Sequence, residues 1–237
     1  MNIPLKHKTP DARIDHITKL AIMAVGGQGG GVLTNWIETL ARSQGYACQA
    51  TSVAGVSQRT GATIYYIEMA PQSERQPIFA LAPSGGDVDV LIAAEMMEVG
   101  RAIMRGFVTP DKTLLIGSTH RALAVSEKTV PGDGVANAEE VRAAAEVAAH
   151  KLILADMEKL AVSEGSVISA SLFGALAGSK ALPFDRSAFE SAIRSGGKGV
   201  DASLRAFAAG FDAAQGGVAP IVQPPKPPEK TMVGPAS

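Results

Sequence analysis

Short apolar runs alternate with amphipathic stretches along most of this chain. The apolar and β-branched runs predict strands, and they occupy residues 20–25, 46–51, 63–69, 87–93, 113–117 and 152–155. Apolar residues at helical spacing predict helices at 32–41, 95–105, 137–150, 157–163, 167–178, 185–195 and 203–212. Because strands and helices alternate, we predict an α/β fold with a mostly parallel sheet and helices on both faces. This layering is Rossmann-like, and the C-terminal part after the last strand is helical.

Polar and proline-rich segments at the two ends set the predicted domain boundaries. Residues 1–16 are a polar N-terminal arm, and residues 17–214 hold all the predicted strands and helices in one domain. Residues 215–237 are rich in proline, so we expect a disordered tail that cannot pack a core. The arm has no apolar stretch typical of a signal peptide, and glycines interrupt the apolar run at 20–37. We therefore expect no membrane span and a cytoplasmic protein.

The composition suits a buried core and argues against a nucleic-acid or membrane partner. Hydrophobic residues make up 46% of the chain and charged residues 19%, with a formal net charge of −1. With this net charge the chain has no excess of basic residues, so we predict neither nucleic-acid nor membrane binding. The single cysteine, Cys48, lies in an apolar run and is expected to be buried. One thiol excludes a disulfide within the chain, and an iron–sulfur cluster needs about four thiolates.

A glycine-rich turn separates the first predicted strand from the first predicted helix. The sequence reads Val25-Gly-Gly-Gln-Gly-Gly-Gly-Val32, and residues 26–31 are here called the glycine turn. Glycine accepts positive φ angles and lets another group approach closely, while a helix that begins there presents free amides. Two interpretations follow: a binding site for an anion or a partner's backbone, or simply a tight turn. Under the first, the cofactor-binding candidates are Gly27, Gln28, Gly29 and Gly30.

The glycine turn lacks parts of the dinucleotide-binding fingerprint. A G-x-G-x-x-G match that starts at Gly27 needs glycine at position 32, which is valine. The acidic residue that binds a ribose hydroxyl is also missing, because no Asp or Glu occurs from Thr39 to Ile67. No Gly-Lys-Ser/Thr sequence of a P-loop follows either. A stand-alone dinucleotide-binding oxidoreductase is therefore an alternative rather than the main interpretation.

Two more polar loops are predicted at the carboxyl ends of strands, where ligands of parallel sheets bind. Arg59 lies in the first loop, among hydroxyl and amide side chains that suit a phosphate or a carboxylate. A plain surface arginine is the other interpretation. The cofactor-binding candidates in this loop are Ser57, Gln58, Arg59 and Thr60. The second loop carries His120, a candidate general acid or base, or else a histidine held by hydrogen bonds within its loop.

The sequence carries no complete catalytic set. No residue spacing is typical of a zinc site, and no Gly-x-Ser-x-Gly nucleophile elbow is present. A polar edge without chemistry of its own indicates a subunit that completes an active site on another chain.

Several motifs together resemble one known family. The glycine turn is followed by Ser57-Gln-Arg-Thr-Gly-Ala-Thr63, and this pair resembles the γ-type domain of the 2-oxoacid:ferredoxin oxidoreductases. The chain looks closest to the β subunit of the indolepyruvate (arylpyruvate) ferredoxin oxidoreductases, over about residues 17–212. Three further segments fit that subunit: Ala93-Ala-Glu-Met96, Gly117-Ser-Thr-His-Arg121 and Gly196-Gly-Lys-Gly-Val200.

The resemblance implies a heteromeric enzyme whose reactive groups lie on another subunit. A large α subunit would carry thiamine diphosphate, Mg²⁺ and [4Fe–4S] clusters, while this chain would bind no cofactor by itself and be inactive alone. The reaction would be oxidative decarboxylation of an arylpyruvate with coenzyme A, giving an acyl-CoA and passing electrons to a ferredoxin-type acceptor. The glycine turn and residues 57–60 would pack at the interface near thiamine or coenzyme A. A purely structural role in assembly is a further alternative.

Overall fold

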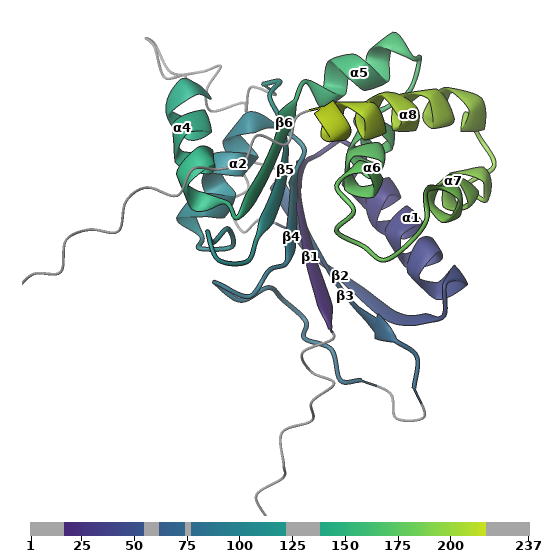
Figure 1. Cartoon of the computed structure of the whole chain (residues 1–237), viewed down its shortest axis with the longest axis horizontal. Helices are drawn as coiled ribbons and strands as arrows, with labels where there is room; N and C mark the ends of the chain where they lie inside the picture. Colours follow the sequence, from purple (N-terminus) through teal and green to yellow (C-terminus); the bar gives the residue numbers. More distant parts are fainter. Residues whose placement is uncertain (1–16, 55–61, 74–76, 122–137, 217–237) are drawn as a thin grey trace, which may run out of the picture.

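A single six-stranded sheet with helices on both faces organises the protein (Figure 1). The computed structural model describes residues 17–54, 62–73, 77–121 and 138–216. The arm at 1–16 and residues 217–237 of the predicted tail lie outside the described residues. The strands are β1 (Thr18–Val25), β2 (Tyr46–Ala54), β3 (Ala62–Pro71), β4 (Val90–Ala93), β5 (Leu114–Ser118) and β6 (Lys151–Ala155). The helices in the described ranges are α1 (Gly30–Ser43), α2 (Met96–Met104), α4 (Ala138–Ala148), α5 (Met157–Ser163), α6 (Ile168–Gly178), α7 (Arg186–Arg194) and α8 (Val200–Gly216).

The sheet is parallel except at one edge. Its strand order is β2-β3-β1-β4-β5-β6, and β1, β4, β5 and β6 run parallel to one another. β3 pairs antiparallel with both β1 and β2. A parallel β2–β3 pair would need a crossover of about a dozen residues or more, whereas residues 55–61 alone join these strands. The predicted mostly parallel α/β sheet is confirmed, and the short connection explains its antiparallel edge.

The larger core lies between the sheet and the helices α1, α5, α6, α7 and α8 (Figure 1). Every residue of α6 is buried, and the Phe173 ring lies 4.9 Å from that of Phe189. α6 and α8 touch backbone to backbone, since a Cβ added at Gly210 would lie 2.0 Å from the Ser171 carbonyl oxygen. The small apolar residues predicted at 167–178 therefore serve close helix packing.

The helices α2 and α4 cover the opposite face (Figure 1). Val99 of α2 and Ala145 of α4 are fully buried there. α4 ends at Ala148, so the prediction that the helix reaches His150 was wrong. The His150 backbone N–H instead donates to the Thr113 carbonyl at 2.9 Å, which fixes the chain as it enters β6.

Ion pairs occupy the amino edge of the sheet, where β4 begins three residues later than the predicted strand at 87–93. Lys112 Nζ lies 2.9 Å from Asp87 Oδ1 and 3.2 Å from Asp89 Oδ1. Asp87 also accepts a hydrogen bond from Lys19 Nζ, which with Lys112 lowers the pKa of its carboxyl group. The two carboxylates therefore tie neighbouring strands together instead of lengthening β4.

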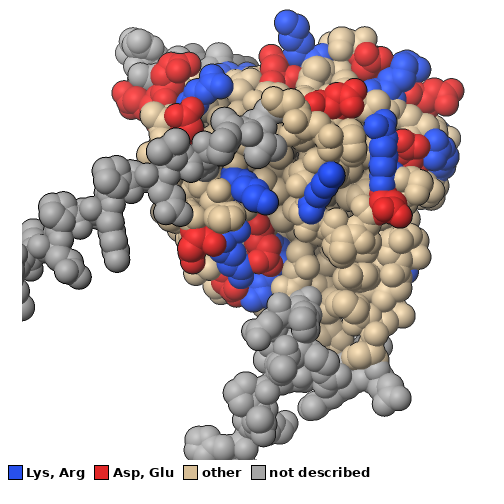
Figure 2. Space-filling model, in the orientation of Figure 1, with Lys and Arg blue, Asp and Glu red and all other residues tan. Residues whose placement is uncertain are grey.

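Charged side chains are unevenly spread over the surface. In the view of Figure 2 they gather along the top and at the lower left of the folded part, whereas the lower right, over β2 and β3, shows almost none. The 77–83 segment is held beside β2, since Thr51 Oγ1 donates to the Leu81 carbonyl at 2.8 Å. This segment leaves Ile78 94% exposed.

Within the described ranges no single helix has the length and hydropathy of a membrane span; α5 and α6 reach both only as a pair bent by 116°.

Candidate functional site

The carboxyl edge of the parallel strands brings two of the three predicted polar loops together. The glycine turn follows β1, and residues 118–121 comprise the buried last residue of β5, Ser118, and the three residues after it. Gln28 Nε2 of the first loop lies 3.2 Å from His120 Nε2 of the second. The third loop, with Ser57, Gln58, Arg59 and Thr60, lies outside the described residues. Its flanking strand begins at the same edge, because Ala62 pairs with Val25.

The glycine turn is a tight bend that opens α1. Gln28 donates its backbone N–H to the Val25 carbonyl at 3.1 Å, and its Oε1 accepts from the Val25 N–H at 2.8 Å. Gly27 and Gly29 have φ angles of +90° and +69°, a region that favours glycine. Gly29 caps α1 without a side-chain hydrogen bond, and the first turn of α1 has no acidic residue. The first amides of α1 are therefore left for an anion or a partner's carbonyl group.

Close packing also constrains the glycine turn. A Cβ at Gly30 would lie 2.4 Å from Tyr65 Cε2, so the tyrosine ring of β3 rests on the helix backbone. A Cβ at Gly29 would lie 3.0 Å from Ser169 Oγ of α6. That hydroxyl is buried and has no hydrogen-bond partner among the described residues. Packing thus favours glycine at Gly30, and a tight contact together with a positive φ favours it at Gly29, as the tight-turn interpretation states.

His120 is hydrogen-bonded through both ring nitrogens. Its Nδ1 lies 2.8 Å from Ser118 Oγ, and its Nε2 faces Gln28. Ser118 Oγ in turn accepts the Met157 backbone N–H at 3.0 Å, at the start of α5. The His120 carbonyl also accepts from the Met96 N–H at 3.1 Å, at the start of α2. This arrangement is that of a hydrogen-bonded loop histidine, which bonds to its own loop through Ser118 and to the glycine turn through Gln28.

Two buried carboxylates near this edge were not identified from the sequence. Glu95 caps α2 by accepting the Glu98 N–H at 2.9 Å, and both side chains belong to residues that are 1% exposed. Burial raises the pKa of each carboxyl group. Arg121 Nε lies 3.9 Å from Glu95 Oε2, and Arg101 Nε lies 3.1 Å from Glu98 Oε1. An acidic residue two positions after a buried strand, at the start of the next predicted helix, was the available signal, because a carboxylate is favoured at a helix N-terminus.

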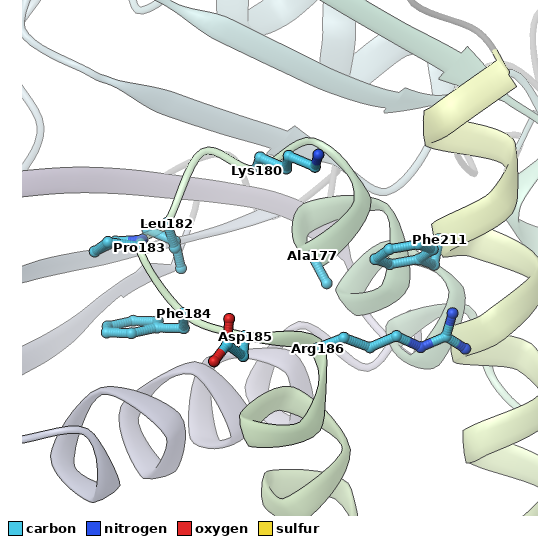
Figure 3. Close-up of a pocket in the computed structure, with 8 residues that line it drawn as sticks. All are labelled: Ala177, Lys180, Leu182, Pro183, Phe184, Asp185, Arg186 and Phe211. Carbon is cyan, nitrogen blue, oxygen red and sulfur yellow. The ribbon is translucent and has the colours of Figure 1, made fainter.

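A shallow pocket of about 300 Å³ lies at the other end of α6 (Figure 3). Its wall carries two cationic and two aromatic side chains. The Arg186 guanidinium is already used, since it stacks 4.5 Å from the Phe211 ring centroid and donates to Glu190 Oε1 at 3.0 Å. An α6 of this length separates the pocket from Ser169 by roughly 15 Å. The pocket is therefore distinct from the carboxyl edge; its lining is Ala177, Lys180, Leu182, Pro183, Phe184, Asp185, Arg186 and Phe211.

The described residues do not fit a metal ion or an iron–sulfur cluster. Among them, no three His, Cys, Asp or Glu side chains converge on one point. Cys48 is buried, and burial raises the pKa of its thiol to about 12. The nearby Glu38 carboxylate adds to this shift. A thiol in such surroundings stays protonated, whereas a cluster is held by thiolates.

Two proteins named indolepyruvate oxidoreductase subunit IorB are similar to this chain along most of its length. The protein from Pyrococcus horikoshii is 28% identical over 201 residues, which cover 83% of this chain and 95% of that protein. The protein from Thermococcus kodakarensis is 26% identical over 211 residues, with the same two coverages.

Solved structures with the same fold belong to related enzymes. The pyruvate oxidoreductase subunit PORC from Thermotoga maritima has a TM-score of 0.61 at 19% identity, covering 86% of this chain and 98% of that chain. The 2-oxoglutarate:ferredoxin oxidoreductase from Magnetococcus marinus also has a TM-score of 0.61, at 13% identity, covering 88% of this chain and 32% of that chain. Beyond these folds, the family model described as pyruvate ferredoxin/flavodoxin oxidoreductase matches residues 19–213. The chain belongs to this family, as the sequence motifs predicted.

Proposed function

We propose that this chain is the small, cluster-free subunit of an indolepyruvate-type 2-oxoacid:ferredoxin oxidoreductase. The similarity to the two archaeal IorB subunits over 83% of the chain is the observation that carries this proposal. The start of α1 has no side-chain cap and no acidic residue in its first turn, which supports a role in binding an anion or a partner's backbone. The enzyme would convert an arylpyruvate and coenzyme A to an acyl-CoA, and the chain would be inactive alone.

A large partner subunit would supply the cofactors of this reaction. Thiamine diphosphate, held there with Mg²⁺, stabilises the carbanion that decarboxylation produces, and [4Fe–4S] clusters carry the electrons to a ferredoxin-type acceptor. The Magnetococcus marinus enzyme of the same fold was solved with 2-oxoglutarate, coenzyme A and succinyl-CoA bound. A thioester-forming reaction is therefore a reasonable class for this chain's complex.

The residues of this chain would shape one wall of the active site. The amides at the start of α1, with Gly27 to Gly30, would face a phosphate group or the partner's backbone. The Gln28 amide would contribute to the same surface beside His120. Arg59, with Ser57, Gln58 and Thr60, would bind a phosphate of coenzyme A or the substrate carboxylate.

Arg59 gives a direct test of this wall in the reconstituted complex. We expect Arg59→Ala to raise the KM for coenzyme A or the oxoacid about tenfold, because a hydrogen bond to a charged group contributes about 1.5–3 kcal/mol. The control is Arg194→Ala, which removes an exposed ion pair with Glu190 on α7. Unchanged kcat and KM in both variants would contradict a binding role for Arg59.

An assembly role without any residue in the active site is the second candidate. The tight packing of Gly30 on Tyr65 favours it, because packing alone explains glycine at that position. Substituting Gly26 by alanine discriminates the two, since a Cβ there meets nothing within 4 Å among the residues that the structure describes. A variant that assembles normally but loses turnover supports the active-site wall. Lost assembly supports the structural role.

A further inference from the structure

A line of hydrogen bonds joins the glycine turn to the end of β5. It runs from the Val25 N–H to Gln28 Oε1 (2.8 Å), and from Gln28 Nε2 to His120 Nε2 (3.2 Å). From there it continues through His120 Nδ1 to Ser118 Oγ (2.8 Å), which also accepts the Met157 N–H (3.0 Å). β4 lies between β1 and β5 in the sheet, so the Gln28–His120 bond spans the end of a whole strand.

The donors and acceptors along this line fix the protonation of His120. The Val25 N–H can only donate, so Gln28 must turn its oxygen toward Val25 and its NH₂ group toward His120. His120 Nε2 must then accept, which requires a neutral ring that carries its proton on Nδ1. That Nδ1–H donates to Ser118 Oγ, whose two lone pairs also receive the Met157 N–H.

Gln28 is the side chain through which the turn can be held, because the other residues of the glycine turn are all glycines. Gly27 and Gly29 have positive φ, and a Cβ at Gly27 would meet nothing within 4 Å among the described residues. A bond from Gln28 to a fixed neighbour therefore adds to the restraint that the packing of Gly29 and Gly30 places on the turn. His120 is such a neighbour, since its carbonyl receives the first amide of α2.

We infer that His120 is a positioning residue: as a neutral ring protonated on Nδ1, it holds Gln28 and thereby the glycine turn in the conformation that exposes the amides of α1. What the amides of α1 bind depends on the proposed function. Whether His120 restrains the glycine turn does not depend on it, because every contact that is involved lies within this chain.

Two substitutions separate the two ring nitrogens of His120. A glutamine can place its amide oxygen where Nε2 lies and so accept from Gln28. An asparagine can place its amide nitrogen where Nδ1 lies, which keeps the bond to Ser118 and loses the one to Gln28. The readout is backbone amide hydrogen exchange of the full-length chain, followed at Val25 and Gly29 by NMR, together with the ¹⁵N shifts of the His120 ring.

We expect the wild-type ring to show the neutral Nδ1–H tautomer at neutral pH. His120→Asn should speed exchange of the Val25 amide about fivefold, the factor that corresponds to one hydrogen bond of about 1 kcal/mol. His120→Gln should restore most of the protection. A charged or Nε2–H ring in the wild type, or equal exchange in the two variants, would overturn the inference. The ring measurement decides it even where a variant does not fold, and none of these readouts needs a partner subunit.

Discussion

Two serines on α6 differ in one respect that a stability measurement can detect. Both are fully buried, but Ser171 Oγ donates to the Met157 carbonyl at 2.6 Å, whereas Ser169 Oγ has no partner among the described residues. An unmade hydrogen bond leaves the full desolvation penalty of the hydroxyl in the folded state. The buried hydroxyl of Ser169, next to the glycine turn, is therefore expected to lower the free energy of unfolding.

Removing the two hydroxyls should therefore have opposite effects. We expect Ser169→Ala to leave the free energy of unfolding unchanged or to raise it by up to about 1 kcal/mol, while Ser171→Ala lowers it by about 1 kcal/mol. Urea unfolding followed by circular dichroism measures both. Equal losses in the two variants would show that Ser169 has a hydrogen-bond partner after all.

The buried carboxyl group of Glu98 predicts a pH dependence of stability. Burial raises its pKa above the ordinary value of 4.5, with Arg101 opposing the shift. The folded state therefore holds this proton more tightly than the unfolded state. The resulting stabilisation is complete below the ordinary pKa and is lost as the pH rises through the folded pKa.

Glu98→Gln removes the titrating carboxyl group and with it the loss of stability at high pH. The free energy of unfolding of the variant, relative to that of wild type, should therefore increase as the pH is raised from about 4 to about 8. Glu190 is the control with the opposite sign, because its hydrogen bond from Arg186 lowers its pKa. The stabilisation that the Glu190 carboxylate contributes is present above its ordinary pKa and is lost as the pH falls through its lowered pKa in the folded state. Glu190→Gln should therefore lose stability relative to wild type over the same rise in pH, and parallel slopes for the two variants would contradict the account.

At the scale of elements, the contact between α6 and α8 depends on glycine. A Cβ at Gly210 would lie 2.0 Å from the Ser171 carbonyl oxygen, while one at Gly216 on the same helix meets nothing within 4 Å. We expect Gly210→Ala to lower the free energy of unfolding by about 3 kcal/mol or more, since overpacking against backbone has no cheap relaxation. Gly216→Ala should be neutral or slightly stabilising, because alanine is the better helix former. Thermal unfolding distinguishes them, and a tolerated Gly210→Ala would contradict the packing described.

Most elements were predictable because their patterns are local. The apolar strand predicted at 113–117 and the helix predicted at 157–163 appear as β5 and α5. Asp156 caps α5 by accepting the Lys159 N–H at 2.9 Å. The late start of β4 was not predictable, because Asp87 and Asp89 lie before the strand and form ion pairs with lysines that are distant in sequence. The antiparallel edge depends on how β2 pairs, which no single segment encodes.

The site was predictable only in its parts. The glycine turn and His120 were both recognised from local sequence, but the bond between Gln28 and His120 joins residues 92 positions apart. Ser169 gave no signal at all, because its importance comes from lying under Gly29 after α6 has packed. Local chemistry thus identified the candidates, and the arrangement of the sheet decided their partners.

At the scale of the whole molecule, the described residues form a polar edge where the loops after β1 and β5 meet. Its described residues hold no metal-binding cluster, and its single cysteine is buried and protonated. The start of α1, which has no side-chain cap, and the nearly uncharged surface over β2 and β3 are features that a partner subunit can cover (Figure 2). The family and the two IorB relatives agree with a subunit of a larger oxidoreductase.

Reduction of ferredoxin by indolepyruvate and coenzyme A, measured with the purified chain alone and after adding its large partner subunit, tests the central claim most directly. The account predicts no turnover and no bound thiamine, flavin or nicotinamide for the chain alone, and turnover that appears and saturates as the chain is titrated into the partner. Turnover by the isolated chain, or a redox group bound to it, would contradict the account.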